Sequence, residues 1–525
     1  MSFLVLPPRA RRVRCATPVA LALSVLLLPA TAGAQALPAR IQAVLDRPEF
    51  RHASWALEFY DLRDRRVVFG VNNDRLMVPG STTKLLTMGT ALEVLGPDHR
   101  FTTRVYRTGP VRDGILDGDL VLVASGDPNL SGRARPDGTY AFIDHDHSYG
   151  GPPLDTDPLT VLRDLARQVA GHGIRAITGQ VIVDASLFPE GERDGGTGVT
   201  MGPLVINDNV IDIVVTPAAT AGMPARVEVT PRTSYLTVRA HVLTSDSGQA
   251  QRFDAREDST DRSHRVLVAT GSVPVGSAAQ NLRWVVPEPG RFGEVVLAEA
   301  LEDVDVAALP RLASRTVDFA ALADAYVDSL VVAEHVSLPL IEEAVVVLKT
   351  SQNLHASNFP LLLASLPEAR DQARTGFDLE HDWLERAGLD LDGAAQGDGA
   401  GARAHFSPAF MTRFLGLVAS RPWADGFRAA LPVLGRDGTL ADIQVDAPGA
   451  GHVQAKTGTY GIFDPLNRRL LITGKGLAGY LTTRGGREIA FAIYVNNFAT
   501  DQPDPAVIAG QALGEIASLA WEEIP

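Results

Sequence analysis

The sequence contains very little lysine. Only four of its 525 residues are lysine, at positions 84, 349, 456 and 475, whereas arginine supplies the other 44 of its 48 basic residues. Arginine stays protonated in proteins, but a lysine amine can be brought into the neutral pH range and act as a base. A retained lysine therefore marks a position where a guanidinium serves poorly. Three of the four lie beside hydroxyl-bearing motifs, which predicts serine nucleophile chemistry driven by lysine.

Cysteine is nearly absent as well, since Cys15 is the only one. It lies in a segment typical of an export signal, in which basic residues at Arg9–Arg14 precede the apolar run Val19–Leu28 and the small residues Ala32–Ala34. Pro29 ends the apolar run well short of the ~20 residues that span a bilayer. Cleavage after residue 34 leaves no thiol, which excludes disulfides, cysteine nucleophiles and cysteine-ligated metals.

Runs of basic residues and long hydrophobic runs are also missing after this segment. The formal net charge is −14 and falls to −18 without residues 1–34, which carry four arginines and no acidic residue. Proteins that bind nucleic acid present a basic patch, so no nucleic-acid partner is expected. No later stretch predicts a transmembrane anchor. We therefore expect an exported, soluble protein of the periplasm or another extracytoplasmic compartment.

The remaining sequence contains two kinds of pattern. Residues 37–96 and those after Val317 combine strand-like and helical patterns, whereas the middle consists of short β runs with Gly, Pro and Asp turns. We expect a signal peptide at 1–34, an α/β domain split between 35–98 and 316–525, and a β-rich insertion of two subdomains at 99–315. The expected hairpin is Ser54–Asp61 with Arg65–Gly70, and the expected helices are Thr82–Leu95, Pro158–Ala170, Phe319–His335, Pro339–Leu348, Asn353–Leu366, Pro408–Ala419 and Pro505–Glu522.

Ser81 and Lys84 are three residues apart at the expected start of a helix. This spacing places both side chains on one helical face, and the free N–H groups of a helix start favour an oxyanion near Ser81. Lys84 can take the Ser81 proton if burial or a like charge lowers its pKa from ~10.4, and Lys456 is the expected source of that charge. The spacing alone also fits a helix-capping serine followed by a solvated lysine.

Ser351-Gln352-Asn353 follows the helix that is expected to end near Lys349. The Ser351 hydroxyl can pass a proton to a leaving amine, and the Asn353 amide can hold a peptide carbonyl. Alone the motif is weak, because the same residue types mark ordinary turns and caps. Lys349 is either a charge that supports the site without touching the substrate or a cation that completes its helix C-terminus, and the second interpretation is favoured.

Lys456-Thr457-Gly458-Thr459 follows an alternating apolar run, which predicts an edge strand. Lys456 and Thr457 are candidates for binding a terminal carboxylate. The Thr459 N–H is placed to form an oxyanion hole with the Ser81 N–H. Gly458 is expected to keep the strand surface bare so that a substrate backbone can approach.

The three motifs occur in the order SxxK, SxN, KTG, which resembles the penicillin-recognising serine acyl-transferases. Further segments resemble the D-Ala-D-Ala carboxypeptidase/endopeptidase family, the class C low-molecular-mass penicillin-binding proteins. They are Gly118–Leu120, Ser125–Leu130, Asn207–Asp212, Lys349–Leu354 and Gly435–Leu440. The large insertion between SxxK and SxN is also that family's architecture.

The resemblance implies an α/β (α+β) serine β-lactamase/transpeptidase-like fold that the β-rich insertion splits. It implies that Ser81 is the acylated nucleophile, that Lys84 is its base, and that Ser351 passes the proton to the leaving D-alanine. The implied activity is that of a serine-type D-alanyl-D-alanine carboxypeptidase, with DD-endopeptidase action on cross-links as a related activity.

The resemblance also assigns binding roles. It implies that Asn353 anchors the acyl side of the substrate and that Lys456 and Thr457 hold the carboxylate, with Gly458 and Thr459 completing the binding edge. The expected partners are peptidoglycan stem peptides, with β-lactams as inhibitors. Neither a metal nor another cofactor is expected.

Three departures from the family pattern lie near the expected site. A family loop of the type D-G-S-G-L-S reads Asp398–Arg403 here, and its hydroxyl is missing. An extra segment, about Tyr460–Thr473, precedes the family-like Gly476–Leu481. The middle residue of SxN is Gln352, where Asp is common. None of these removes a catalytic group, but the first two bear on substrate choice and turnover.

Other functions remain open from the sequence. A β-lactamase would use the same acyl-enzyme chemistry, but the large insertion argues against it. A non-catalytic peptidoglycan-binding scaffold would keep the fold, but the intact motif set argues against it. The cluster His145-Asp146-His147 could serve a zinc peptidase, yet it lacks H-E-x-x-H and is interpreted as a solvated loop. Lys475, between two glycines, is interpreted as a turn residue.

Overall fold

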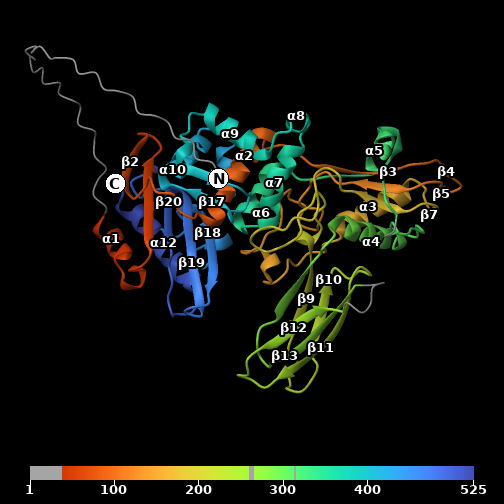
Figure 1. Cartoon of the computed structure of the whole chain (residues 1–525), viewed down its shortest axis with the longest axis horizontal. Helices are drawn as coiled ribbons and strands as arrows, with labels where there is room; N and C mark the ends of the chain where they lie inside the picture. The colour runs from red at the N-terminus through yellow and green to blue at the C-terminus, as the bar shows by residue number, and fades with distance from the viewer. Residues whose placement is uncertain (1–37, 259–264, 313–314) are drawn as a thin grey trace, which may run out of the picture.

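A five-stranded antiparallel sheet, ordered β18-β19-β20-β1-β2, forms the centre of the lobe on the left of Figure 1. The computed structural model describes residues 38–258, 265–312 and 315–525, so the expected signal peptide lies outside the described residues. The sheet joins two strands from the beginning of the chain to three from its end. The strands are β1 (Ser54–Asp61), β2 (Arg66–Val71), β18 (Val453–Asp464), β19 (Arg469–Thr482) and β20 (Glu488–Asn496).

Helices cover both faces of this sheet because its central strands are buried on both sides. In β20, Phe491 and Ile493 belong to the core under α12, whereas Ala492 and Tyr494 belong to the core under α2 and α10. One face carries α1 (Ala39–Leu45) and α12 (Pro505–Glu523). The other side carries α2 (Lys84–Leu95), α6 (Leu340–Lys349), α7 (Asn353–Ser365), α8 (Pro367–Asp371), α9 (Gly376–Arg386), α10 (Pro408–Val418) and α11 (Ala424–Ala429), with the short strands β16 (Ala394–Gln396) and β17 (Ala404–Phe406).

The segment between the two halves of this lobe forms a second lobe with its own apolar core. Its main sheet has the order β15-β3-β6-β8, and a small sheet has the order β4-β5-β7. The elements are β3 (Thr102–Arg107), β4 (Val111–Arg112), β5 (Ile115–Leu116), β6 (Leu120–Val123), α3 (Thr160–Gly171), β7 (Ala176–Ile177), β8 (Val181–Asp184), α4 (Pro289–Glu302), α5 (Phe319–Leu322) and β15 (Val331–Val336). Because β15 pairs with β3, we propose that the insertion extends to Val336 rather than to residue 315.

Two three-stranded sheets project from the second lobe, at the bottom of Figure 1. They have the orders β10-β9-β14 and β11-β13-β12, and a small core of Val215, Val242, Ala269 and Val273 lies between their strands. The strands are β9 (Val210–Thr216), β10 (Arg226–Thr230), β11 (Thr237–Ser245), β12 (Arg252–Glu257), β13 (Val266–Pro274) and β14 (Gln280–Val285). The predicted α/β architecture with extra β-rich parts is confirmed.

One predicted helix is wrong, and one helix of the insertion was not predicted. Residues 319–335 do not form one helix but α5, two short 3₁₀ turns and β15, because the β-branched Val331 and Val332 pair with β3. The insertion also contains a second long helix, α4, which begins at Pro289. Its first residues, Pro289 and Gly290, are typical of turns, although proline is also common at the first position of a helix. The hairpin of β1 and β2 is confirmed. Within the described residues, no helix is both long and apolar enough to cross a membrane.

Candidate active site

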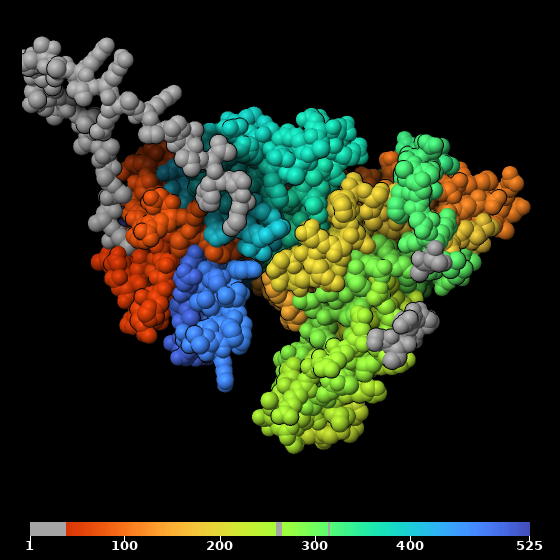
Figure 2. Space-filling model, in the orientation of Figure 1, coloured from red at the N-terminus to blue at the C-terminus, as the bar shows by residue number. Residues whose placement is uncertain are grey.

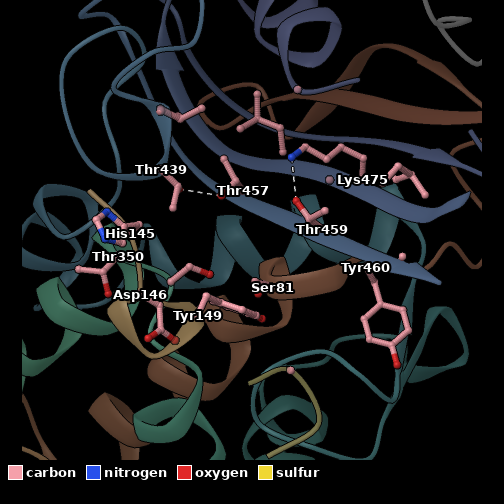
Figure 3. A pocket seen from close by; sticks show the side chains of 18 of the residues that line it. Ser81, His145, Asp146, Tyr149, Thr350, Thr439, Thr457, Thr459, Tyr460 and Lys475 are labelled. Carbon is pink, nitrogen blue, oxygen red and sulfur yellow. Dashed lines mark hydrogen bonds between the residues drawn. The ribbon is translucent and has the colours of Figure 1, made fainter. Parts of the chain in front are cut away.

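A cavity of about 730 Å³ lies between the edge strand β18, the turn before α7 and loops of the inserted lobe. Figure 3 shows Ser81 between Thr457 and Thr459 of β18 on one side and Tyr149 and Asp146 of the inserted lobe on the other. All three predicted motifs therefore reach one cavity. Segments far apart in the sequence form it, so neither lobe contains the complete site.

Ser81 lies in a 3₁₀ turn, Gly80–Thr83, directly before α2, and is partly exposed to the cavity. Gly80 adopts a left-handed φ of 54°, and a Cβ there would lie 2.5 Å from the Thr459 backbone nitrogen. Only glycine fits this position, and the tight contact places the Thr459 nitrogen beside the nucleophile turn. The Ser81 hydroxyl thus faces a helix start and the edge strand together.

Lys84 is the first residue of α2 and is fully buried. Its Nζ lies 2.9 Å from Ser81 Oγ, 2.9 Å from the Ser351 carbonyl oxygen and 3.2 Å from Ser351 Oγ. It also donates to the side-chain oxygen of Asn353. The alternative of a solvated lysine is therefore wrong, since one amine contacts both serine hydroxyls.

Burial lowers the pKa of Lys84 from 10.5 to about 8, although the charges of Asp146, Asp194 and Asp398 act in the opposite direction. Burial is one of the two causes predicted for this shift, whereas the other predicted cause, the charge of Lys456, does not contribute to it. A fraction of the amine is already neutral at pH 7, because the pKa lies within about one unit. Lys84 is therefore able to accept a proton from Ser81.

Ser351 occupies the turn between α6 and α7 with a left-handed φ of 64°. Such a φ is unfavourable for a residue with a Cβ, and strain of this kind is concentrated at functional sites. The Gln352 side chain accepts a hydrogen bond from the His355 N–H at 3.1 Å and so caps α7. The departure at Gln352 therefore has a structural role, while Ser351 still lines the cavity and Asn353 lies buried beside it.

Lys456 is also fully buried, and its Nζ donates to the Thr457 carbonyl oxygen at 2.8 Å. Burial, followed by the charges of Lys84 and Lys475, holds the pKa of Lys456 well below its usual range. The Thr457 and Thr439 hydroxyls are 2.7 Å apart. Two hydroxyls and a buried amine thus surround the place predicted for a substrate carboxylate.

Gly458 has a different physical role from the predicted one. A Cβ at this position would lie 2.0 Å from the Pro79 carbonyl oxygen and 3.0 Å from the Ser81 backbone nitrogen. The missing side chain therefore allows the edge strand to touch the nucleophile turn, rather than leaving a surface bare for substrate. This contact sets the distance between β18 and Ser81.

Lys475 is not a turn residue, as the sequence predicted, but lies within β19 and lines the cavity. Its Nζ donates to Thr459 Oγ1 at 2.7 Å, as Figure 3 shows, and its stem lies against Gly510 of α12. Burial lowers the pKa of Lys475 to about 8. The sequence carried one signal for this residue, since lysine is rare in the chain, but its flanking glycines suggested a turn.

Lys349 is the last residue of α6, as expected, and it makes an ion pair rather than only completing the helix. Its Nζ lies 2.7 and 2.8 Å from the two carboxylate oxygens of Asp437. Asp437 precedes Gly438 and Thr439, and Thr439 contacts Thr457. Lys349 therefore fixes the position of a cavity wall without entering the cavity.

The loop with His145, Asp146 and His147 is mostly buried, so its interpretation as a solvated loop is wrong. Asp146 accepts hydrogen bonds from the Asn353 N–H at 3.0 Å and from the Gln352 amide at 3.3 Å. Tyr149 Oη accepts a hydrogen bond from the Asn353 side-chain amide at 2.6 Å. The insertion thus orients Asn353 so that its side-chain oxygen faces Lys84.

Asp146, His147 and Asp208 are close enough together to hold a metal ion, the one such group among the described residues. Their carboxylates are already engaged, because Asp208 pairs with Arg133 at 2.6 Å and with His147 at 3.0 Å. Asp146 in turn holds the turn of the SxN motif. These contacts give the three side chains a structural function, and His145 of the sequence cluster points instead towards the Pro152 carbonyl oxygen at 3.3 Å.

The departing loop, Asp398–Arg403, keeps its shape without the missing hydroxyl. The Asp398 carboxylate accepts hydrogen bonds from backbone N–H groups of Ala400 at 2.9 Å, Gly401 at 2.5 Å and Ala402 at 3.2 Å. A Cβ on Gly401 would lie 2.1 Å from the Gly80 carbonyl oxygen. The loop therefore supports the nucleophile turn through its backbone.

Several known proteins are similar to this chain in sequence. A model described as the D-Ala-D-Ala carboxypeptidase 3 (S13) family matches residues 37–515. A D-alanyl-D-alanine carboxypeptidase of an Actinomadura species is 28% identical over 513 residues, with 92% of this chain and 85% of the relative covered. DacB of Haemophilus influenzae is 21% identical over 463 residues, with 84% and 85% covered.

A solved structure has the same fold. Penicillin binding protein 4 from Haemophilus influenzae aligns with a TM-score of 0.66 and 18% identity, over 92% of this chain and 99% of that chain. The same protein has also been solved in complex with a β-lactam, at a TM-score of 0.64 and 17% identity. At these identities the structural likeness shows the fold.

Proposed function

Because the chain belongs to the D-Ala-D-Ala carboxypeptidase 3 (S13) family, it is a serine-type D-Ala-D-Ala carboxypeptidase, and we propose that Ser81 is its acylated nucleophile. The observation that carries this assignment is the 2.9 Å contact between Lys84 Nζ and Ser81 Oγ. A buried amine with a pKa of about 8 is a competent base for a serine hydroxyl. The substrate is a peptidoglycan stem peptide that ends in D-Ala-D-Ala.

Acylation begins when neutral Lys84 takes the Ser81 proton and Ser81 Oγ attacks the carbonyl carbon of the penultimate D-alanine. The oxyanion forms between the backbone N–H groups of Ser81 and Thr459, which the contact through Gly80 holds together. Preorganised donors of this kind typically contribute ~10²–10³ in rate. The intermediate therefore forms where the helix start and the edge strand meet.

Collapse of the intermediate needs a proton on the leaving nitrogen. Ser351 Oγ gives its own proton to the amine and regains one from protonated Lys84, which lies 3.2 Å away. Free D-alanine leaves, and the peptide remains as an ester of Ser81. Water then attacks this ester, with the amine of Lys84 as the base, and restores the Ser81 hydroxyl.

Binding groups surround these steps on two sides. The terminal carboxylate of the substrate lies at Lys456, Thr457 and Thr439. The hydroxyls of the two threonines are 2.7 Å apart. Asn353 holds an amide carbonyl on the acyl side, and Tyr149 fixes the orientation of its amide. Chemically, a D-alanyl cross-link offers the same carbonyl with a larger leaving amine, so DD-endopeptidase action is proposed as a related activity.

The proposed site of action is outside the cytoplasm. The export signal at 1–34 supports this location, as does the chemistry of the substrate, which belongs to the cell wall. β-Lactams are proposed to inhibit the enzyme by acylating Ser81, because their strained amide occupies the place of the D-Ala-D-Ala bond.

The direct test is release of D-alanine from a soluble pentapeptide that ends in D-Ala-D-Ala. The wild-type protein is expected to release one D-alanine per peptide, and Ser81→Ala is expected to release none. Absence of release by the wild type would favour a peptidoglycan-binding scaffold. Rapid turnover of penicillin, faster than peptide cleavage, would favour a β-lactamase.

A further inference from the structure

The β18–β19 hairpin continues well beyond the catalytic cavity. The two strands stay paired as far as Asp464 and Arg469, and Figure 2 shows the hairpin in blue projecting from the body of the molecule. Its turn is held by the Asp464 carboxylate, which accepts hydrogen bonds from the Leu466 N–H at 3.0 Å and from the Asn467 side chain at 2.7 Å. The end of the hairpin is therefore an ordered structure.

This ordered end exposes large apolar side chains to solvent. Ile462, Phe463, Leu466 and Leu470, here called the hairpin tip, are between 40% and 87% exposed. Arg468 lies in the same turn. Single exposed apolar residues are ordinary, but four within nine residues on one ordered projection mark an interaction surface.

A peptide bound in the cavity would extend towards the hairpin tip on its acyl side. Ser351 protonates the leaving amine, so Lys456 and Thr457 mark the leaving-group side of β18, and the strand after Thr459 runs along the acyl side. β18 is the outermost strand of its sheet, and an extended peptide can add to such an edge. In a wall peptide the acyl side leads to the N-terminus, where the peptide is joined to the glycan strand.

The lengths agree. Four peptide residues lie between the scissile bond and the glycan, and they extend over ~13 Å at about 3.3 Å per residue. Phe463 lies four residues after Thr459 on β18, and these four spacings cover the same ~13 Å. The first sugar of a bound wall peptide would then lie beside Phe463, beyond Tyr460, which follows Thr459 directly and lines the cavity.

We propose that the hairpin tip is a docking site for the glycan strand of the peptidoglycan to which the scissile peptide is attached. This inference rests on the proposed function of the adjoining cavity. Phe463 and Leu466 offer apolar surface to the C–H faces and N-acetyl methyl groups of the sugars, and Arg468 offers donors to their oxygens. A lipid surface fits less well, because a chain with a net charge of −14 is repelled by anionic headgroups.

The test compares two substrates with one catalytic step, a free pentapeptide and the same pentapeptide attached to its disaccharide. The variant is Phe463→Ser with Leu466→Ser. Its matched control is Met223→Ser with Leu309→Ser, which removes two similarly exposed apolar side chains from the inserted lobe. D-alanine release gives kcat and KM for each pair.

The hairpin variant is expected to keep its kcat/KM on the free pentapeptide within about twofold and to lose about tenfold on the disaccharide substrate, mainly through KM. The control is expected to change neither value. Equal losses on both substrates, or no loss on either, would overturn the glycan assignment. So would loss of binding to phosphatidylglycerol vesicles with an unchanged substrate ratio, since that result assigns the tip to lipid. Failure of the proposed function is a different result: the wild type would then release no D-alanine from the free pentapeptide.

Discussion

Lys84 is buried, yet its amine reaches four oxygen atoms of Ser81, Ser351 and Asn353. A guanidinium at this position would stay protonated and would be too large for the space between two serine hydroxyls. Lys456 has a different environment, because its Nζ donates to the Thr457 carbonyl oxygen. The role proposed for it is to bind the substrate carboxylate, which does not require the amine to accept a proton from Ser81. The two buried lysines therefore differ in whether they must lose a proton.

The first prediction follows from this difference. Lys84→Arg is expected to lower the rate of acylation by penicillin ~10³-fold or more, because general-base catalysis is lost. Lys456→Arg is expected to keep measurable acylation, with a loss of ~10–100-fold. Stopped-flow measurement with a fluorescent penicillin gives both rates, and circular dichroism checks the fold. Similar losses in both variants would remove the distinction between base and electrostatic partner.

The second prediction concerns stability and pH. The pKa of Lys84 is lowered from 10.5 to about 8, so the folded state binds fewer protons than the unfolded state between these values. Burial of the amine therefore lowers the free energy of unfolding, in full below pH 8 and less and less as the pH rises towards 10.5. A pKa shift of this size corresponds to about 3 kcal/mol.

Lys84→Met is therefore expected to be inactive but more stable than the wild type at pH 7, by up to ~3 kcal/mol, with a gap that narrows towards pH 10. Urea unfolding at both pH values measures this gap. Lys349→Met is the control and should lose stability, because it leaves Asp437 without its ion pair. A variant of Lys84 that is destabilised at pH 7 would contradict the account.

Single residues also show where sequence reasoning stops. The motifs of Ser81, Ser351 and Lys456 are recognisable because their chemistry depends on residue type and short spacing. Lys475 was missed because its contact with Thr459 depends on pairing between β18 and β19, which local glycines do not reveal. Asp146 was missed for a similar reason, since it meets Asn353 only after the two lobes pack together.

At the scale of elements, β18 and the nucleophile turn depend on each other. Gly80 of the turn packs against the backbone of β18, and Gly458 of β18 packs against the backbone of the turn. Neither position has room for a Cβ. The strand carries the carboxylate-binding residues and the turn carries the nucleophile. The separation of these two elements therefore sets the geometry of the oxyanion hole.

The third prediction tests this contact. Gly458→Ala would place a Cβ 2.0 Å from the Pro79 carbonyl oxygen, so β18 must move away from Ser81. Acylation is expected to fall ~10²-fold, the loss expected when one oxyanion donor is displaced, with the fold retained. Gly171→Ala at the end of α3 is the matched control, because its Cβ would meet nothing within 4 Å. Equal acylation rates for both variants would contradict the role of the contact.

Elements were predictable where local pattern decided them. The hairpin of β1 and β2 and the final helix α12 follow from alternation and from helical spacing after a proline. The sequence pattern predicted that the residues of β15 end a helix. They form a strand instead, because they pair with β3, which lies more than two hundred positions earlier in the chain. Long-range pairing of this kind overrides helical propensity and is not visible in a local window.

At the scale of the whole molecule, the insertion is part of the catalytic unit. A buried network joins the lobes behind the SxN motif, in which His355 of α7 contacts Glu343 of α6 at 2.8 Å and Asp208 of the insertion at 3.0 Å. Burial alone would lower the pKa of His355, but the charges and hydrogen bonds of the two carboxylates raise it to about 9. His355 therefore carries a positive charge between the lobes at neutral pH.

The fourth prediction follows from the sign of this shift. A pKa raised above the unfolded value of ~6.5 gives stability that is fully present below pH 6.5 and lost as the pH rises through 9. His355→Gln is expected to be less stable by ~3 kcal/mol at pH 6, with a smaller difference at pH 9.5. Thermal unfolding at the two pH values measures this change, with His381→Gln on the surface of α9 as the control. A difference that does not depend on pH would contradict a charged His355.

The central claim of this account is that Ser81 carries the acyl group during catalysis. Intact-mass measurement after exposure to a penicillin tests it most directly, with the wild type and Ser81→Ala compared under the same conditions. The account predicts an increase of one drug mass in the wild type, located on the peptide that contains Ser81, and no increase in the variant. An unmodified wild type, or an adduct that persists in Ser81→Ala, would contradict it.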